Sequence, residues 1–184
     1  METKKALEIL KKYTTKPNLV KHGVAVSICM KHFAKLEGED EQYWGVVGML
    51  HDIDFEVCPE SHCKERCACM LKDEGFDDKF VHAVQSHGFE ICTDVEPKLY
   101  MEKVLSVVDQ LSGFIIACAL IRPEKKLELV TLESIHKRWK SPAFASGTDR
   151  ARILRVCERM GKTFDYMAEQ TLVALKNGAS ELGL

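Results

Sequence analysis

The segment GVVGMLHDIDFEVCPESH, residues 45–62, is the most informative part of the sequence about the fold. An apolar helical run that includes Val47 and Leu50 ends abruptly in the adjacent polar pair His51-Asp52. Neighbouring side chains on a regular helix point about 100° apart, so these two can share one binding site only where the helix ends. We therefore expect a helix that stops at His51-Asp52 and delivers an imidazole and a carboxylate to the same place.

Apolar residues recur with helical spacing on both sides of this segment, while the sustained alternation typical of strands is missing. The sequence therefore predicts an all-α fold. Asn18 is expected to cap the second helix, Gly38 to end it, and the tail from Asn177 to fray. The expected helices span residues 4–13, 18–38, 39–50, 61–72, 77–87, 97–120 and 132–140, with one or two more between 148 and 175.

No linker or low-complexity segment divides the chain. Its 184 residues, 46% of them hydrophobic, are enough for one compact domain with a sizeable core. We expect a single domain over residues 1–184, with its core at about 18–121 and a helical C-terminal extension at 122–184.

The net charge of −2 gives the chain no global basic field, which argues against a nucleic-acid polymer or a membrane surface as partner. The longest apolar segment, 105–121, contains Asp109 and Gln110 and is therefore not expected to span a membrane. The N-terminal METKKALEIL is charged rather than signal-like, so we expect a cytoplasmic protein. The sequence leaves the oligomeric state open.

Eight cysteines without a secretory signal are expected to be reduced thiols. Cys58, Cys63, Cys67 and Cys69 are crowded together, but their spacing matches no common zinc or iron–sulfur motif. Thiols that face the core are the simpler interpretation. The alternative is a redox-sensitive pair of Cys63 and Cys67, one helical turn apart.

Asp109 has the most unusual position among the acidic residues, because it lies inside the most hydrophobic expected helix. A buried lone carboxylate costs several kcal/mol unless it is paired or binds a metal, and its helical neighbours offer no cation. A divalent ion bound by His22, His51, Asp52 and Asp109 would remove that cost. Two imidazoles and two carboxylates leave coordination positions open for water and substrate, which is typical of catalytic sites.

The order His22, His51-Asp52, Asp109 on the helices of an all-α chain resembles the His-Asp (HD) domain superfamily of metal-dependent phosphohydrolases. The text HDIDFE is similar to the H-D-I-G and H-D-I-A motifs of its small stand-alone members. The resemblance covers about residues 18–120. It implies a single-domain orthogonal helical bundle of the HD-domain type.

The resemblance also implies further metal ligands. Family members with two metals add a histidine at the start of the helix after the dyad and another at the end of the next helix. His62 and His87 stand at those places. The chain departs from the pattern at Gly88, where many dinuclear members have a second histidine, and at Asp54, where the common variant has glycine. One ion and two ions therefore remain open.

The function implied by the resemblance is hydrolysis of a phosphomonoester or phosphodiester, on a nucleotide or a related small molecule, by water activated at one or two divalent ions. Mn, Fe, Ni, Co, Zn and Mg are not distinguishable from these ligand types. Asp54, Glu56 and His62 are the candidates for moving a proton to the leaving oxygen. Arg150, in a FASGTDR segment similar to one in close relatives, and Lys103 are the candidate phosphate contacts.

Two other functions fit the same ligand types. Some dinuclear relatives hold two irons and oxidise carbon with O2, and metal identity decides between oxygenase and hydrolase. A non-catalytic, metal-stabilised domain that binds a small ligand is the third alternative.

Overall fold

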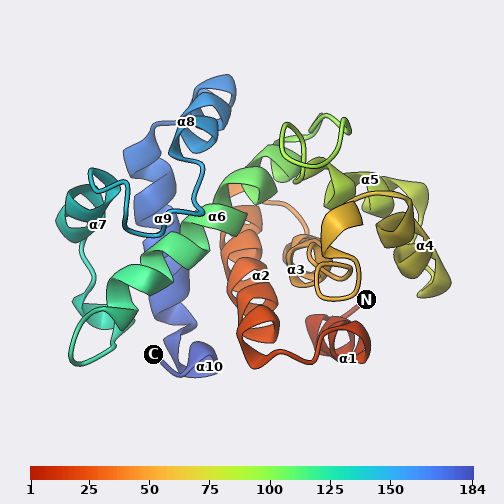
Figure 1. The fold of residues 1–184 in the computed structure, drawn as a ribbon, viewed down its shortest axis with the longest axis horizontal. Helices are drawn as coiled ribbons and strands as arrows, with labels where there is room; N and C mark the ends of the chain where they lie inside the picture. The colour runs from red at the N-terminus through yellow and green to blue at the C-terminus, as the bar shows by residue number, and fades with distance from the viewer.

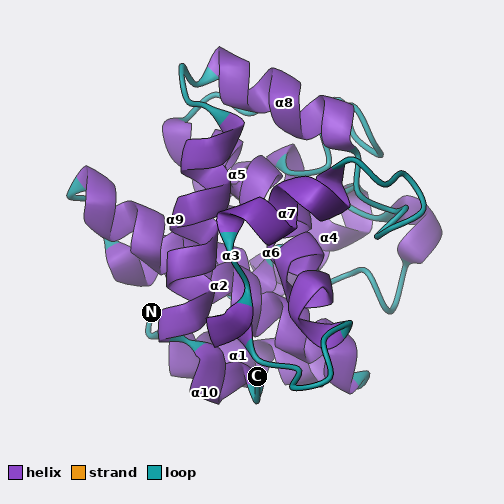
Figure 2. Cartoon of the chain, turned by 90° about the vertical axis from the view of Figure 1, so that its left-hand side faces the viewer, coloured by secondary structure: helices purple, strands orange, loops and turns teal.

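The computed structural model describes residues 1–184 as helices joined by turns, without a strand (Figure 1, Figure 2). Phe89 and Thr93 form only an isolated bridge. The predicted all-α class is thus confirmed. The ten α-helices are α1 (Thr3–Tyr13), α2 (Pro17–Glu37), α3 (Glu41–Leu50), α4 (Glu65–Asp73), α5 (Asp78–Ser86), α6 (Tyr100–Leu120), α7 (Leu132–Trp139), α8 (Arg150–Arg159), α9 (Phe164–Asn177) and α10 (Ala179–Leu182), and the two 3-10 segments are η1 (Pro59–Ser61) and η2 (Leu127–Leu129).

The two longest helices, α2 and α6, pack against each other at the centre of the molecule. Figure 1 shows α1, α3, α4 and α5 on one side of α2 and α7, α8 and α9 on the other. Helix α9 packs on both central helices, and its Met167 and Leu175 belong to the same continuous apolar cluster as Phe33 and Leu111. Residues 122–184 therefore share the core of the preceding helices.

Several helix starts differ from the expected ones: α4 begins at Glu65 and not at residue 61, since Ser61 belongs to η1, and α6 begins at Tyr100 and not at residue 97. The start of α2 also differs. Pro17 occupies the first turn of α2, after Lys16 as N-cap, where its fixed φ and missing N–H cost nothing. Asn18 therefore lies inside the helix and does not cap it. Gly38 ends α2 with a φ of 71°, as predicted. The Asp77 side chain caps α5 by accepting the main-chain N–H of Phe80.

The segment after Asn177 folds, whereas the sequence predicted a frayed tail. Helix α10 packs against α2 and α9, and its Leu182 is buried. The turn before it depends on Gly178, because a Cβ there would lie 2.6 Å from Cδ1 of Ile28. Close packing against α2 holds this last helix in place. The spacing of apolar residues in the sequence does not reveal such packing.

Helix α6 is long and apolar enough to cross a membrane by length and composition. Most of its apolar window, 61%, is buried inside the protein. It is therefore equally well explained as a core helix, and the fold is compatible with a soluble protein.

Two glycines set the distance between α2 and α3. A Cβ on Gly23 would lie 2.9 Å from the carbonyl oxygen of Met49, and a Cβ on Gly48 would lie 3.0 Å from that of Val26. Neither position has room for a larger residue without moving the backbone. The close approach brings the α2 residue beside Gly23, which is His22, next to the end of α3.

Candidate metal centre

Four donor atoms from α2, the end of α3 and α6 converge where the sequence predicted a metal. Nε2 of His22 lies 2.9 Å from Oδ1 of Asp109 and 3.2 Å from Nε2 of His51. The same nitrogen of His51 lies 3.3 Å from Oδ1 of Asp109 and 3.5 Å from Oδ2 of Asp52. Ligands about 2.0–2.2 Å from one ion lie roughly 3.0–3.6 Å from each other. The spacing of this first donor set therefore suits a shared cation.

A second donor set lies on the other side of Asp52. Nε2 of His62 is 3.2 Å from Nε2 of His87 and 3.2 Å from Oδ1 of Asp52, and His87 is 3.5 Å from the same oxygen. Asp52 thus turns Oδ2 toward the first set and Oδ1 toward the second. A carboxylate shared in this way is suited to bridge two neighbouring ions.

The adjacent side chains of His51 and Asp52 converge just beyond the last residue of α3, Leu50. The chain continues from Leu50 in tight turns, beginning with the Ile53 N–H that donates to the Leu50 carbonyl. His51 itself keeps helical φ and ψ as the C-cap, so the departure from regular helical spacing begins after it. This is the geometry that the sequence predicted for the end of the apolar helix.

His51 and His87 are held in the same way at the ends of α3 and α5. Nδ1 of His51 lies 2.8 Å from the carbonyl oxygen of Gly48, and Nδ1 of His87 lies 2.5 Å from that of Val84. A carbonyl only accepts, so Nδ1 carries the proton in each ring. The neutral ring then directs the lone pair of Nε2 into the donor sets, as a metal ligand requires.

Asp54 orients His62 and does not face the donor sets itself. Its Oδ1 lies 2.7 Å from Nδ1 of His62, and its Oδ2 accepts the main-chain N–H of Cys63 over 2.9 Å. The side chain is completely buried. A carboxylate that fixes a ligating histidine is a common support in metal sites. These contacts give Asp54 a positioning role in place of the predicted proton transfer.

The carboxylates of the centre have no lysine or arginine partner: the ion pairs of Asp52, Asp54 and Asp109 are all with histidines. Asp54 is fully buried and the side chains of Asp52 and Asp109 are only 18% and 16% exposed, so holding three negative charges here without a fixed cation is costly. The positive charge must come from protons on the histidines or from a bound ion.

The pKa values show what happens if protons on the histidines supply the positive charge. Burial acts to lower the pKa of His51, but the charges of Asp52 and Asp109 outweigh it and raise that pKa to about 9. For His62, hydrogen bonds to Asp52 and Asp54 likewise outweigh burial and raise the pKa to about 10. Burial acts to raise the pKa of Asp109, yet hydrogen bonds to His22 and His51 hold it well below its usual range. A divalent ion would satisfy the same carboxylates without these protons, so the donor set fits a metal.

Glu56 is not available for the proton transfer that the sequence suggested. It accepts hydrogen bonds from the main-chain N–H groups of Thr15 and Lys16 and from the Thr15 hydroxyl, over 2.6–3.0 Å. The Thr15 hydroxyl, followed by the Lys16 N–H, lowers the pKa of Glu56. Glu56 therefore ties the turn after α3 to the start of α2.

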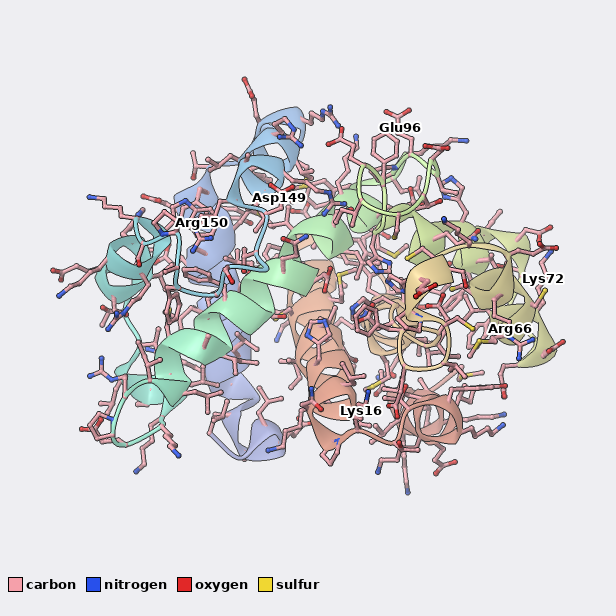
Figure 3. The ribbon with its side chains drawn as sticks, viewed as in Figure 1. Lys16, Arg66, Lys72, Glu96, Asp149 and Arg150 are labelled. Carbon is pink, nitrogen blue, oxygen red and sulfur yellow. The ribbon has the colours of Figure 1, made fainter.

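The two predicted phosphate contacts lie away from the donor sets. Arg150 donates to the carbonyl oxygens of Trp139, Ser141 and Phe144 and stacks on the Phe114 ring. Figure 3 shows it between α7 and α8, where it holds the connecting loop. Its prediction as a phosphate contact is thus not supported. Lys103 lines a cavity of about 300 Å³ that contains none of the metal-ligand candidates.

Arg152, which the sequence analysis did not single out, supports the second donor set from α8. It is buried, and its guanidinium donates to the carbonyl oxygens of His87, Phe89 and Ser106 over 2.6–3.1 Å. It thereby links the end of α5 to α6, three residues before Asp109. The only sequence signal is its place on the apolar face of α8, four residues before the buried Val156.

Gly88, where the sequence departs from many dinuclear HD proteins, is surrounded by sulfur. A Cβ at this position would lie 2.6 Å from Sγ of Cys92 and 2.9 Å from Sγ of Cys63. Any side chain would therefore displace the two thiols. The thiol of Cys63 lies against that of Cys92, from the loop after α5. The sequence had suggested Cys67, one helical turn from Cys63, as its partner.

The candidate ligands are unevenly exposed to solvent: the side chains of Asp52, Asp109 and His62 are 18%, 16% and 12% exposed. His51 is fully buried and the His87 side chain is 4% exposed, whereas the His22 side chain is 22% exposed. His22 lines a cavity together with Lys21, a cation that the sequence analysis overlooked and for which the structure records no ion pair. His22 is thus the most exposed of the six candidate ligands and the one that this cavity reaches.

Comparisons with protein-family models, curated proteins and solved structures gave no match to this chain. Its function is therefore inferred from the donor atoms and their surroundings.

Proposed function

We propose that the chain is a metal-dependent phosphohydrolase of the HD type that uses two divalent ions. The observation that carries this proposal is the position of Asp52, with one oxygen toward His22 and His51 and the other toward His62 and His87. Asp109 completes the first set. Six protein ligands for two ions leave several positions open, as a hydrolytic centre requires.

The residues of this chain have separate roles in the proposed reaction. A divalent ion held by these residues would lower the pKa of its bound water from ~15.7 to about 7 and so provide a nucleophile at neutral pH. His51 and His87 are kept in the ligating tautomer by main-chain carbonyls. Asp54 fixes His62. Lys21 lines the same cavity as His22, with its Nζ toward Gly183, and adds a positive charge to that cavity.

Metal analysis of protein purified without chelator, followed by a panel of phosphomonoesters and phosphodiesters, tests the proposal. We expect about two equivalents of a first-row metal and hydrolysis of at least one class of ester. Asp109→Ala should lose metal and activity together while helicity by circular dichroism is retained. Asp165→Ala, which removes an exposed aspartate paired with His136, is the matched control and should keep both.

His62→Ala separates the two-ion scheme from a one-ion scheme. The bound metal should fall from two equivalents to one, because only the second set loses a donor. His82→Ala, which removes a histidine paired with Glu102 outside the centre, should leave the stoichiometry unchanged. An unchanged stoichiometry in His62→Ala itself would remove His62 from the ligands.

The same preparations discriminate the other two functions. Bound iron with substrate-dependent consumption of O2 and no phosphate release would replace the hydrolase by an oxygenase. Two bound metals without turnover of any ester would favour a ligand-binding module.

A further inference from the structure

A cavity of about 280 Å³ lies between α2 and α6 and shares His22 with the first donor set; it is here called the α2–α6 pocket. Asn18, Lys21 and His22 line it from α2, Gly113, Ile116 and Leu120 from α6, and Leu182 and Leu184 from the last residues of the chain. In Figure 1 the two long helices diverge downward from their contact, and α10 lies between their lower ends.

The helical register joins the pocket to the donor atoms. On α6, Gly113, Ile116 and Leu120 follow Asp109 at intervals of three or four residues, so all four lie on one face of the helix. His22 is both a donor of the first set and a wall of the pocket. A molecule whose phosphate lies at the donor sets would therefore extend its remaining atoms along this face.

The walls of the pocket on α6 and at the end of the chain are apolar, and they leave space unfilled. A Cβ on Gly113 would meet no atom within 4 Å, so the glycine leaves free space one turn beyond Asp109. Leu120 is about half exposed, although it lies beside the buried Leu182. Asn18, Lys21 and His22 are the polar residues of the lining, and apolar atoms make up most of the pocket surface. Covering the leucines with an apolar group would gain about 25 cal/mol for each Å² removed from water.

Building on the proposed function, we propose that the α2–α6 pocket binds the organic group of the substrate, and that the substrate is a phosphomonoester of a compact apolar alcohol. The pocket volume, about 280 Å³, lies just below the roughly 300–1,000 Å³ typical of ligand pockets, which suits one ring or a short aliphatic chain. A sugar or nucleobase against these apolar walls would leave its polar atoms without partners, at a cost of about 1–3 kcal/mol each. Nucleotides are therefore disfavoured.

The test uses the full-length, metal-loaded protein and two matched sets of compounds. The first is a series of n-alkyl phosphates from methyl to octyl, with phenyl phosphate, glycerol phosphate and a nucleoside monophosphate for comparison. The second is methylphosphonate and hexylphosphonate, which resist hydrolysis and report binding by calorimetry. We expect kcat/KM to rise about fourfold per methylene up to the length that fills the pocket, and hexylphosphonate to bind at least tenfold more tightly than methylphosphonate.

Two variants change the pocket in opposite directions. Gly113→Leu fills the free space and should abolish the preference of the protein for hexylphosphonate over methylphosphonate. Leu184→Ala widens the end of the pocket and should move the optimum to a longer chain. Gly147→Leu introduces the same residue in an exposed loop where a Cβ also meets nothing, and should keep the wild-type preference. Circular dichroism and metal content establish that each variant is folded.

The outcomes separate this inference from the proposed function. Hydrolysis of phosphoesters with no dependence on chain length, or with a preference for nucleotides, would overturn the pocket assignment and leave the hydrolase standing. Tighter binding of hexylphosphonate that Gly113→Leu abolishes, without hydrolysis of any ester, would support the pocket and overturn the hydrolase. Equal binding of both phosphonates by the wild-type protein would overturn the pocket assignment in either case.

Discussion

Oδ1 of Asp54 lies 2.7 Å from Nδ1 of His62, and this contact fixes which nitrogen of His62 faces Asp52. Asp54→Asn is therefore expected to weaken metal binding at the second donor set about 10- to 100-fold, because the amide is uncharged and its NH2 group would face the Cys63 N–H. Competition with a metal-sensitive dye measures the affinity. Glu56→Gln alters a carboxylate outside the centre and should leave it unchanged; equal losses in both variants would contradict the role of Asp54.

The metal-free protein should lose stability as the pH rises. The pKa values of His51 and His62 are raised in the folded state to about 9 and 10, above the unfolded value near 6.5. Their protonated forms therefore stabilise the fold fully below about pH 6.5, and this contribution disappears as the pH passes 9–10. Thermal unfolding should show a Tm several degrees lower at pH 10 than at pH 7, since 1 kcal/mol shifts Tm by about 2–4 °C in a chain of this size.

Metal binding should have the opposite pH dependence to the stability of the metal-free protein, because ligation requires both histidines to be deprotonated. We expect the apparent metal affinity to increase between pH 6 and pH 9 and protons to be released on binding. Calorimetric titration in two buffers of different ionisation enthalpy counts those protons. Metal affinity that is independent of pH over this range would show that the ion binds elsewhere.

Gly23→Ala should separate α2 from α3, because the new methyl group would lie 2.9 Å from the rigid Met49 carbonyl. We expect a loss of about 1–3 kcal/mol in the free energy of unfolding, together with weaker metal binding at the first donor set. Gly113→Ala is the control within a helix, where a Cβ meets nothing and alanine gains up to about 1 kcal/mol in helix propensity. Urea unfolding of the two variants should thus shift in opposite directions.

Arg152→Met is expected to lower the free energy of unfolding by about 2–4 kcal/mol, because three buried carbonyl oxygens lose their donor. The second donor set should lose more metal affinity than the first, since the carbonyl of His87 is one of the three. Arg155→Met, on the exposed side of the same helix, removes only a surface ion pair with Glu90 and should change stability by less than about 1 kcal/mol. Comparable losses in both variants would count against a specific role for Arg152.

The sequence predicted those parts of the centre that depend on helical position. The apolar run before His51-Asp52 marked the end of a helix, and the apolar surroundings of Asp109 marked a buried charge. Both predictions state where a residue lies relative to the hydrophobic core. The spacing of apolar residues along a helix indicates that position directly. The structure also brings His62 and His87, which only the family resemblance suggested, to Asp52.

Residues whose roles depend on loops were harder to assign. Asp54 and Glu56 lie two residues apart in one turn, yet Asp54 is buried against His62 and Glu56 reaches back to Thr15. Arg150 and Arg152 lie two residues apart on α8 and therefore on different faces. The first holds a loop and the second supports the donor set. Sequence spacing alone does not report which neighbours a turn or an amphipathic helix will meet.

The contact between Arg152 and the His87 carbonyl has a consequence for how the protein matures. A nascent chain that has emerged as far as Leu120 already carries all six candidate ligands, but it lacks the guanidinium that joins the end of α5 to α6. We therefore expect the second donor set to reach its full metal affinity only after α8 has been synthesised and has docked, while the first set can bind an ion earlier.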